Sequence, residues 1–199
     1  MSMIRESIVV TVNALGEPHL APLGLIAEGE AWILAPFHPS TTLDNLRQAP
    51  FAVANFTDDV RVFAGCLTGR RDWPLTAATL VAAPRLAATL SHIELVVVEV
   101  REHELRPRFV CRVAHRASHA PFLGFNRAQA AVIEGAVLVS RLHMLPRAGV
   151  EAELARLEIT VGKTAGPAES EAWSWLKDKA AQIFAGSDLE AGLAGHPGH

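Results

Sequence analysis

Three consecutive hydroxyl residues are the first candidates for chemistry in this sequence. Ser40, Thr41 and Thr42 stand where an apolar run ends and a short helical pattern, residues 39–47, begins. The first N–H groups of a helix lack partners within the helix, and the helix dipole places partial positive charge there. Hydroxyl and N–H donors at such a terminus can bind a phosphate without a lysine. The alternative is an ordinary helix cap, for which Ser and Thr are common choices.

Other polar groups in the sequence are weaker evidence for a functional site than these hydroxyls. Residues 55–59 (NFTDD) follow an apolar run and, taken alone, have the pattern of a strand end with a turn. Cys111, His115 and His119 are spaced by four residues, and thiolate and imidazole ligands suit zinc. However, Cys111 and His115 end an expected strand, and no fourth ligand stands out. We therefore expect no metal site, and no side chain stands out as a catalytic acid or base.

The first half of the chain has the pattern of an antiparallel sheet. Apolar or β-branched runs cover residues 8–12, 19–27, 31–36, 51–56, 92–100 and 108–115. The first three runs are joined by turns too short for a parallel crossover. Pro22 falls within the second run, which predicts an edge strand or a bulge. Residues 62–67 are too short a run to assign.

The second half has helical periodicity. Apolar residues recur at intervals of three and four over 128–142, 150–161 and 169–184, and Asn126 is the expected N-cap of the first helix. Trp173 and Trp175 are two residues apart, so they cannot both face one core. The pattern predicts an α+β chain with a mainly β core. We expect a β-barrel domain at 1–120, a helical annex at 121–186 and a flexible tail at 187–199.

Composition excludes several classes of protein. The chain has 199 residues, of which 50% are hydrophobic and 20% charged, so a disordered chain is excluded. A net charge of −3 argues against nucleic acid as a partner, and two cysteines cannot build a disulfide framework. No apolar run approaches the ~18 residues of a membrane span. The sequence predicts a soluble, cytoplasmic protein with neither nucleic acid nor membrane as a partner.

Two sets of motifs carry a family resemblance. A strand containing PLG (22–24), the helix STTLDNL (40–46) and the strand AVANFTDD (52–59) occur in the order found in FMN-binding split barrels. These are relatives of the flavin reductases and of pyridoxamine-phosphate oxidase. The stretch FNRAQAAVIE (125–134) and the later VGKT (161–164) resemble an uncharacterised family of FMN-binding split-barrel proteins. That family occurs in archaea and in bacteria with tetrahydromethanopterin-linked one-carbon metabolism, and the resemblance covers residues 3–185.

The resemblance implies where a cofactor would bind. FMN is expected at the interface of a homodimer, with its phosphate on the 40–42 loop and its isoalloxazine edge along the backbone of residues 19–25. The loop has no basic residue, so Arg127 or Arg141 is expected to supply the positive charge; an ordinary salt bridge is the alternative. The residues implied in FMN binding are His19, Pro22, Leu23, Gly24, Ser40, Thr41, Thr42, Asn45, Asn55, Thr57 and Arg127.

Two functions remain open at this point. The first is a dimeric FMN-dependent oxidoreductase that acts with a reduced nicotinamide or a pterin-type one-carbon carrier. In that case the flavin carries the redox chemistry and the protein orients it. The second is a non-catalytic FMN-binding carrier or assembly module.

Overall fold

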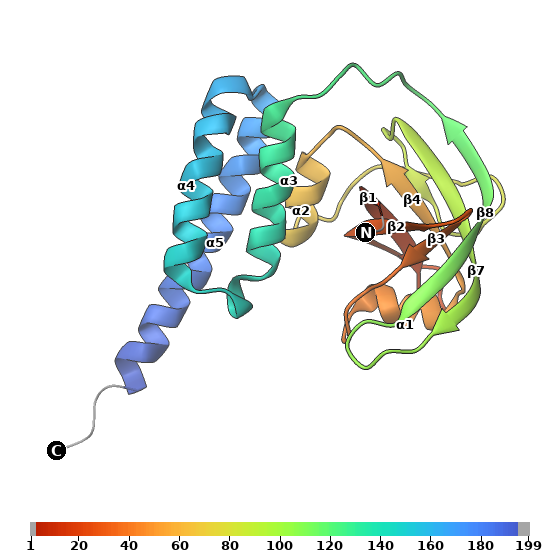
Figure 1. Ribbon diagram of the computed structural model, residues 1–199, viewed down its shortest axis with the longest axis horizontal. Helices are drawn as coiled ribbons and strands as arrows, with labels where there is room; N and C mark the ends of the chain where they lie inside the picture. The colour runs from red at the N-terminus through yellow and green to blue at the C-terminus, as the bar shows by residue number, and fades with distance from the viewer. Residues whose placement is uncertain (1–2, 195–199) are drawn as a thin grey trace. The chain divides into compact units, whose positions relative to one another are not determined.

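The computed structural model describes residues 3–194, except for the side chains of residues 187–194. The chain divides into two compact units. The first is built from Met1–Asp58 and Arg71–Leu123, and the second from Asp59–Arg70 and Gly124–His199, as far as they are described. The first unit is a barrel and the second a group of helices (Figure 1). This arrangement confirms the predicted α+β split-barrel fold with C-terminal helices.

Six antiparallel strands close the barrel in the order β1-β2-β3-β8-β7-β4. Their bounds are β1 Ile4–Val12, β2 Pro18–Glu28, β3 Ala31–Leu34, β4 Phe51–Phe56, β7 Ser91–Arg101 and β8 Arg108–Ser118. Every second side chain of a strand points inward, and these side chains form an apolar core that includes Val9, Leu25, Ala54, Leu95 and Phe109.

The barrel is split because β3 is short. Strand β2 pairs with β1 over residues 18–26 but with β3 only from Ile26 onward. Strand β8 pairs with β3 only through Phe109–Cys111. Within residues 3–194, the remaining length of each strand therefore has one unpaired edge. Pro22, which lies opposite Ile8, falls in this stretch of β2, so the predicted edge position is confirmed.

Helix α1 (Thr41–Gln48) covers one end of the barrel, the lower end in Figure 1. Its apolar side chains Leu43 and Leu46 are buried in the barrel core. Asn45, on the same side of the helix, donates a 3.0 Å hydrogen bond to the Thr11 hydroxyl at the end of β1. These contacts fix the position of the residues that precede the helix.

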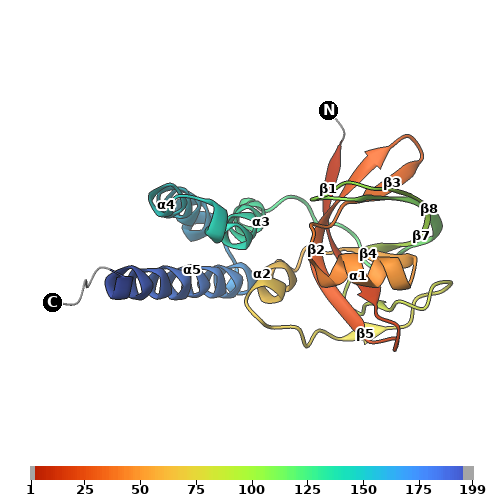
Figure 2. The same ribbon diagram turned by 90° about the horizontal axis from the view of Figure 1, so that it is seen from below.

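A small hairpin covers part of the outer surface of the barrel. It consists of β5 (Leu75–Thr76) and β6 (Arg85–Leu86), and Figure 2 shows β5 outside the barrel wall. Between these strands, Ala83 packs against Val12 and Val53, which project outward from β1 and β4. Outward-facing residues beneath this segment are consequently buried rather than exposed.

The second unit contains helices α2 (Arg61–Leu67), α3 (Arg127–Ser140), α4 (Arg147–Thr164) and α5 (Pro167–Ala194), with a 3-10 turn, η1, at Leu142–Met144. Asn126 caps α3, as predicted, through a 2.7 Å bond from the Ala128 N–H. Helix α2 comes from the region the sequence left unassigned and packs against α3 and α5.

The two tryptophans of α5 pack against one hydrophobic cluster, so the expectation that they cannot both face one core is wrong. Trp173 is buried against Gly135, whereas Trp175 is half-buried beneath the guanidinium of Arg70, 4.3 Å from the ring centre.

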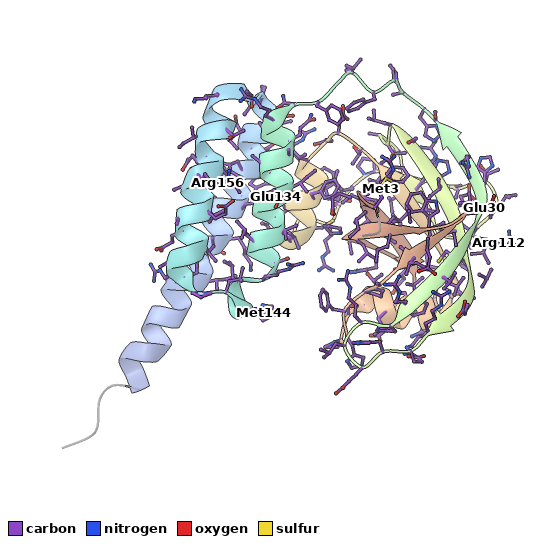
Figure 3. The ribbon with its side chains drawn as sticks, in the orientation of Figure 1. Met3, Glu30, Arg112, Glu134, Met144 and Arg156 are labelled. Atoms are coloured by element: carbon purple, nitrogen blue, oxygen red, sulfur yellow. The ribbon has the colours of Figure 1, made fainter. Side chains whose placement is uncertain are left out.

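Charged side chains also link α3 and α4, where Figure 3 labels Glu134 and Arg156. The pKa of Arg156 is raised mainly by Glu153 and, to a smaller extent, by Glu134.

Helix α5 is longer than expected. It continues to Ala194, whereas the sequence pattern placed its end near residue 184. The rest of the expected tail, 195–199, lies outside the described residues. Among the described residues, no helix combines the length and the apolarity needed to cross a membrane.

Candidate functional site

The start of α1 offers hydrogen-bond donors, as the sequence predicted. Ser40 is the N-cap, and its hydroxyl accepts the Leu43 N–H at 3.3 Å. Within residues 3–194, no protein acceptor meets the backbone N–H of Thr41 or Thr42. Thr41 is exposed, but Thr42 is only 4% exposed, so its side chain belongs more to the packing beneath the helix. The donors open to a ligand are therefore two backbone N–H groups and the hydroxyls of Ser40 and Thr41.

An arginine that the sequence did not assign lies beside this loop. The Arg106 Nε donates a 2.6 Å hydrogen bond to the Ala35 carbonyl, and its guanidinium lies 4.7 Å from the centre of the Phe37 ring. Arg106 belongs to the turn between β7 and β8, far from the loop in sequence, so only the folded barrel brings the two together. Arg47, at the other end of α1, pairs with Glu102 at 2.8 Å.

Two asparagines expected at the cofactor serve the framework of the barrel. Asn45 is buried and bonded to Thr11. Asn55 is fully buried on the outward side of β4. Its amide donates to the carbonyls of Ile8 and Val53, and its oxygen accepts the Leu86 N–H. Alternation along β4 turns this side chain away from the barrel interior and beneath the hairpin, and its implied role at a flavin stays a prediction.

The expected isoalloxazine strand has the open edge that such a contact needs. Leu23 packs toward the core, and its carbonyl accepts the Ser7 hydroxyl at 2.7 Å. At Gly24 a Cβ would lie 2.6 Å from the Ile4 side chain, so the need for glycine here comes from packing. His19 is half-buried, and burial, followed by the charge of Arg71, lowers its pKa.

The last two predicted residues, Thr57 and Arg127, lie outside the 40–42 loop in the sequence. Thr57 follows β4 and is half-buried. Arg127 is the first residue of α3 and is exposed, but it belongs to the helical unit. Arg106, by contrast, belongs to the barrel unit and contacts Ala35 and Phe37 in the segment between β3 and α1.

A cavity of about 840 Å³, called the large cavity below, opens at the end of the barrel opposite α1. Arg5, at the start of β1, lies on its wall, whereas Thr11, at the end of β1, contacts α1. None of the residues predicted for FMN lines it. The lining residues are Arg5, Trp32, Phe56, Leu90, Ser91, Ile93, Arg116, Ser118, His119, Ala120, Pro121 and Phe122.

The histidines near this cavity group with Glu94 rather than with Cys111. A register shift between Glu94 and Leu95 in the β7–β8 ladder brings His115 opposite Glu94. Cys111 instead faces the barrel core, where burial raises the pKa of its thiol to about 12. Arg112, labelled in Figure 3, projects from the outer side of the same strand. The side-chain cluster that forms contains His92, Glu94 and His115, whose ligand atoms lie within 4.8 Å of one another.

Glu94 is the most strongly bonded side chain of the cluster. It is fully buried and accepts the backbone N–H groups of Thr79, Leu80 and Val81 at 2.6, 2.6 and 2.9 Å. Burial alone would raise its pKa, but these three donors, together with His92, lower the pKa to about 2. Glu94 is therefore ionised at neutral pH.

Family models match almost the whole chain. A model of the N-terminal domain of "protein of unknown function (DUF447)" matches residues 5–120, and a second DUF447 model matches residues 126–178. The chain belongs to the DUF447 family. Among curated proteins, no sequence matches this DUF447 chain.

Solved structures share the DUF447 fold or its barrel. An FMN-bound DUF447 protein from Methanosarcina mazei is 18% identical with a TM-score of 0.79; the match covers 90% of this chain and 96% of that one. A protein assigned as a split-barrel flavin reductase from Shewanella frigidimarina is 12% identical with a TM-score of 0.52, over 57% and 66% of the chains. A nitrilotriacetate monooxygenase component B homologue from Mycobacterium thermoresistibile is 15% identical with a TM-score of 0.50, over 57% and 68%.

Proposed function

We propose that this DUF447 chain binds FMN, with the phosphate at the start of α1. The observation that carries the proposal is the pair of N–H groups at Thr41 and Thr42, which have no partner in the described part of the chain and lie beside the hydroxyl of Ser40. Arg106 adds a positive charge against Phe37 in the preceding segment. A dianionic phosphate gains from all of these donors and from the helix dipole. The FMN-bound relative from Methanosarcina mazei supports the choice of cofactor.

The apolar surface next to this loop fits a flavin shared between two copies of the chain. Phe37 and Leu105 are 51% and 62% exposed, and the His38 N–H bonds the Leu105 carbonyl at 2.9 Å. The rings of the cofactor and the surface of a second copy would remove these side chains from water. We therefore propose a homodimer with the flavin at its interface. Light scattering at micromolar concentration should give twice the chain mass; a monomer that still binds FMN would contradict a shared site.

We further propose that the bound flavin makes the protein an oxidoreductase that acts with a nicotinamide or a pterin-type carrier. The fold shared with the split-barrel flavin reductase supports flavin chemistry, while the nicotinamide and the one-carbon carrier rest on resemblance in sequence alone. Bound flavin supplies hydride-transfer chemistry, and the barrel would hold and orient it. The alternative remains a non-catalytic FMN carrier.

One measurement separates the two. FMN-loaded protein is mixed anaerobically with NADH or NADPH, and the visible flavin absorbance is followed. Bleaching that saturates with nicotinamide supports the oxidoreductase. Flavin that only dithionite reduces, and that no carrier-type substrate reoxidises, supports the carrier.

A further inference from the structure

A row of three side chains connects a buried carboxylate to the wall of the large cavity. His92, 2% exposed, places Nε2 3.3 Å from Glu94 Oε1. Its other nitrogen, Nδ1, lies 2.9 Å from Nε2 of His119. His119 is exposed and lines the cavity, and its own backbone N–H is held by the Leu90 carbonyl at 2.7 Å. The row therefore runs from the outer side of β7 over the rim of the barrel.

The geometry determines which nitrogen atoms carry protons. The ring planes of His92 and His119 differ by 8°, and their centres are 5.1 Å apart while the facing nitrogens are 2.9 Å apart. The rings consequently meet edge to edge, as an in-plane hydrogen bond requires. Ionised Glu94 can only accept, so His92 Nε2 carries a proton and His92 Nδ1 accepts the proton of His119 Nε2. This arrangement leaves His119 Nδ1 unprotonated.

Burial, aided by the charge of Arg85, lowers the pKa of both rings and so favours their neutral forms. Burial lowers the pKa of His92, Glu94 opposes that change, and Arg85 and His115 add to it. Burial also lowers the pKa of His119, followed by the charges of Arg85 and His92. A neutral imidazole with an unprotonated nitrogen is a proton acceptor, and the carboxylate behind it stabilises the cation that forms.

The cavity wall indicates what kind of molecule would meet His119. Trp32 and Phe56 offer aromatic surface, Arg5 and Arg116 offer positive charge, and among the described residues no carboxylate lines the cavity. A flat conjugated molecule could stack on the aromatic side chains, and a negative charge formed on it would face the arginines.

We propose that His119 is a catalytic proton acceptor for a flat conjugated ligand that carries an acidic O–H or N–H. The ligand's O–H or N–H bond breaks, its electron pair stays on the ligand as an anion facing Arg5 and Arg116, and the proton forms an N–H bond at His119 Nδ1. His92 and Glu94 are positioning residues that orient this ring and stabilise its cation. This site goes beyond flavin binding and does not depend on it.

A bound cation would be a different use of the same cluster, and the hydrogen bonds argue against it. A carboxylate has about four lone-pair positions. Oε1 of Glu94 accepts Thr79 N–H and His92, and Oε2 accepts the N–H groups of Leu80 and Val81. All four positions are occupied, so no lone pair is left for a metal ion.

The experiment uses 4-nitrophenol, a flat acidic phenol whose anion absorbs visible light while its neutral form does not. Difference absorbance, in which any bound flavin cancels, is recorded as purified protein is added below the pKa of the free phenol. Wild type should raise the phenolate signal saturably. His119→Gln, a change at an exposed position, should reduce the signal roughly tenfold or more. Arg116→Gln should weaken binding of the anion.

The positioning residues have their own readout. Glu94→Gln should move the midpoint of phenolate formation to higher pH, because the base it supports is weaker. ¹⁵N spectra of the histidines should show the Nε2–H tautomer of both His92 and His119 in the wild type. His115→Gln is the matched control, because His115 lies near His92 without a hydrogen bond to the row. Unchanged phenolate signal in His119→Gln would overturn the proposal. So would a signal lost both in His115→Gln and on adding EDTA, which would indicate a bound cation.

Discussion

The side-chain oxygen of Asn55 accepts the backbone N–H of Leu86 at 2.9 Å, and this bond fastens the β5–β6 hairpin to the barrel. The same amide group donates to Ile8 and Val53 carbonyls across the β1–β4 pair. One buried side chain thus joins three segments that are distant in sequence. Its neighbour on β7, His92, lies directly opposite in the ladder and begins the row that reaches the cavity.

Replacing Asn55 with alanine should destabilise the barrel. Three hydrogen bonds are lost, and the Leu86 N–H is left buried without its acceptor, so the free energy of unfolding should fall by about 2–4 kcal/mol. Chemical denaturation measures the change. At a temperature where the variant is folded, its affinity for FMN should equal that of the wild type, because the hydrogen bonds described for the amide all lie within the barrel. A variant of normal stability with weak FMN binding would instead indicate that Asn55 contacts FMN.

The start of α1 should recognise the phosphate of FMN rather than the ring. Thr41→Val, at an exposed position, removes one hydroxyl donor, and Arg106→Gln removes the nearby charge. Each should weaken FMN binding by about tenfold, the loss expected for one charge-assisted hydrogen bond. Flavin-fluorescence titration measures the affinity.

Riboflavin provides the control for this titration because it lacks the phosphate. It should bind wild type weakly and should not distinguish Thr41→Val from the wild type. Thr41→Glu, which sets a negative charge against the phosphate at the exposed position, should weaken FMN binding further. Equal FMN affinity in wild type, Thr41→Val and Arg106→Gln would show that the loop is only a helix cap.

The sequence predicted the elements better than the contacts between them. Local patterns sufficed for the six strands of the barrel and for the cap at Asn126, but not for Trp173 and Trp175, which pack against one cluster. His92 and Glu94 also stand two apart in a predicted strand, which places them on one face, and this signal could have been used. Local pattern could not predict that residues 79–81 would supply three N–H groups to Glu94. A cluster completed by distant backbone becomes visible only in the fold.

Register is a second feature that local pattern does not contain. The spacing of Cys111, His115 and His119 does not by itself predict a metal site, and a register shift in the β7–β8 ladder separates Cys111 from the two histidines. Such bulges change the side to which every later side chain points. Arg106 was missed for a related reason, since its partner segment at Ala35–Phe37 is reached only when β3 and β8 pair.

Packing of the helical unit should depend on the absence of a side chain at Gly135. A Cβ there would lie 2.6 Å from the buried ring of Trp173, which has little room to move. Overpacking of this kind costs about 1–3 kcal/mol, which outweighs the gain of up to about 1 kcal/mol from the better helix propensity of alanine. Gly135→Ala should therefore lower the melting temperature and alter the tryptophan fluorescence. Gly162→Ala is the matched control, because a Cβ at that helical position meets nothing within 4 Å, and it should stabilise the protein slightly. A stabilised Gly135→Ala would contradict the tight contact.

Glu94 should make the barrel sensitive to acid in a defined pH range. Its pKa is about 2 in the folded protein against an ordinary value of 4.5, because the N–H groups of residues 79–81 favour the ionised form. A lowered pKa stabilises the fold above the unfolded value, and that stabilisation is lost as pH falls from 4.5 toward 2. The full loss is about 3 kcal/mol. Urea unfolding at several pH values should show this decline in the wild type. The Glu94→Gln variant should be less stable than the wild type at pH 6. Between pH 4.5 and 2 its free energy of unfolding should fall by about 3 kcal/mol less than that of the wild type. The fall that remains comes from the other carboxylates, which the variant keeps. Parallel curves for the two proteins would show that the three N–H groups do not hold Glu94 in its ionised form.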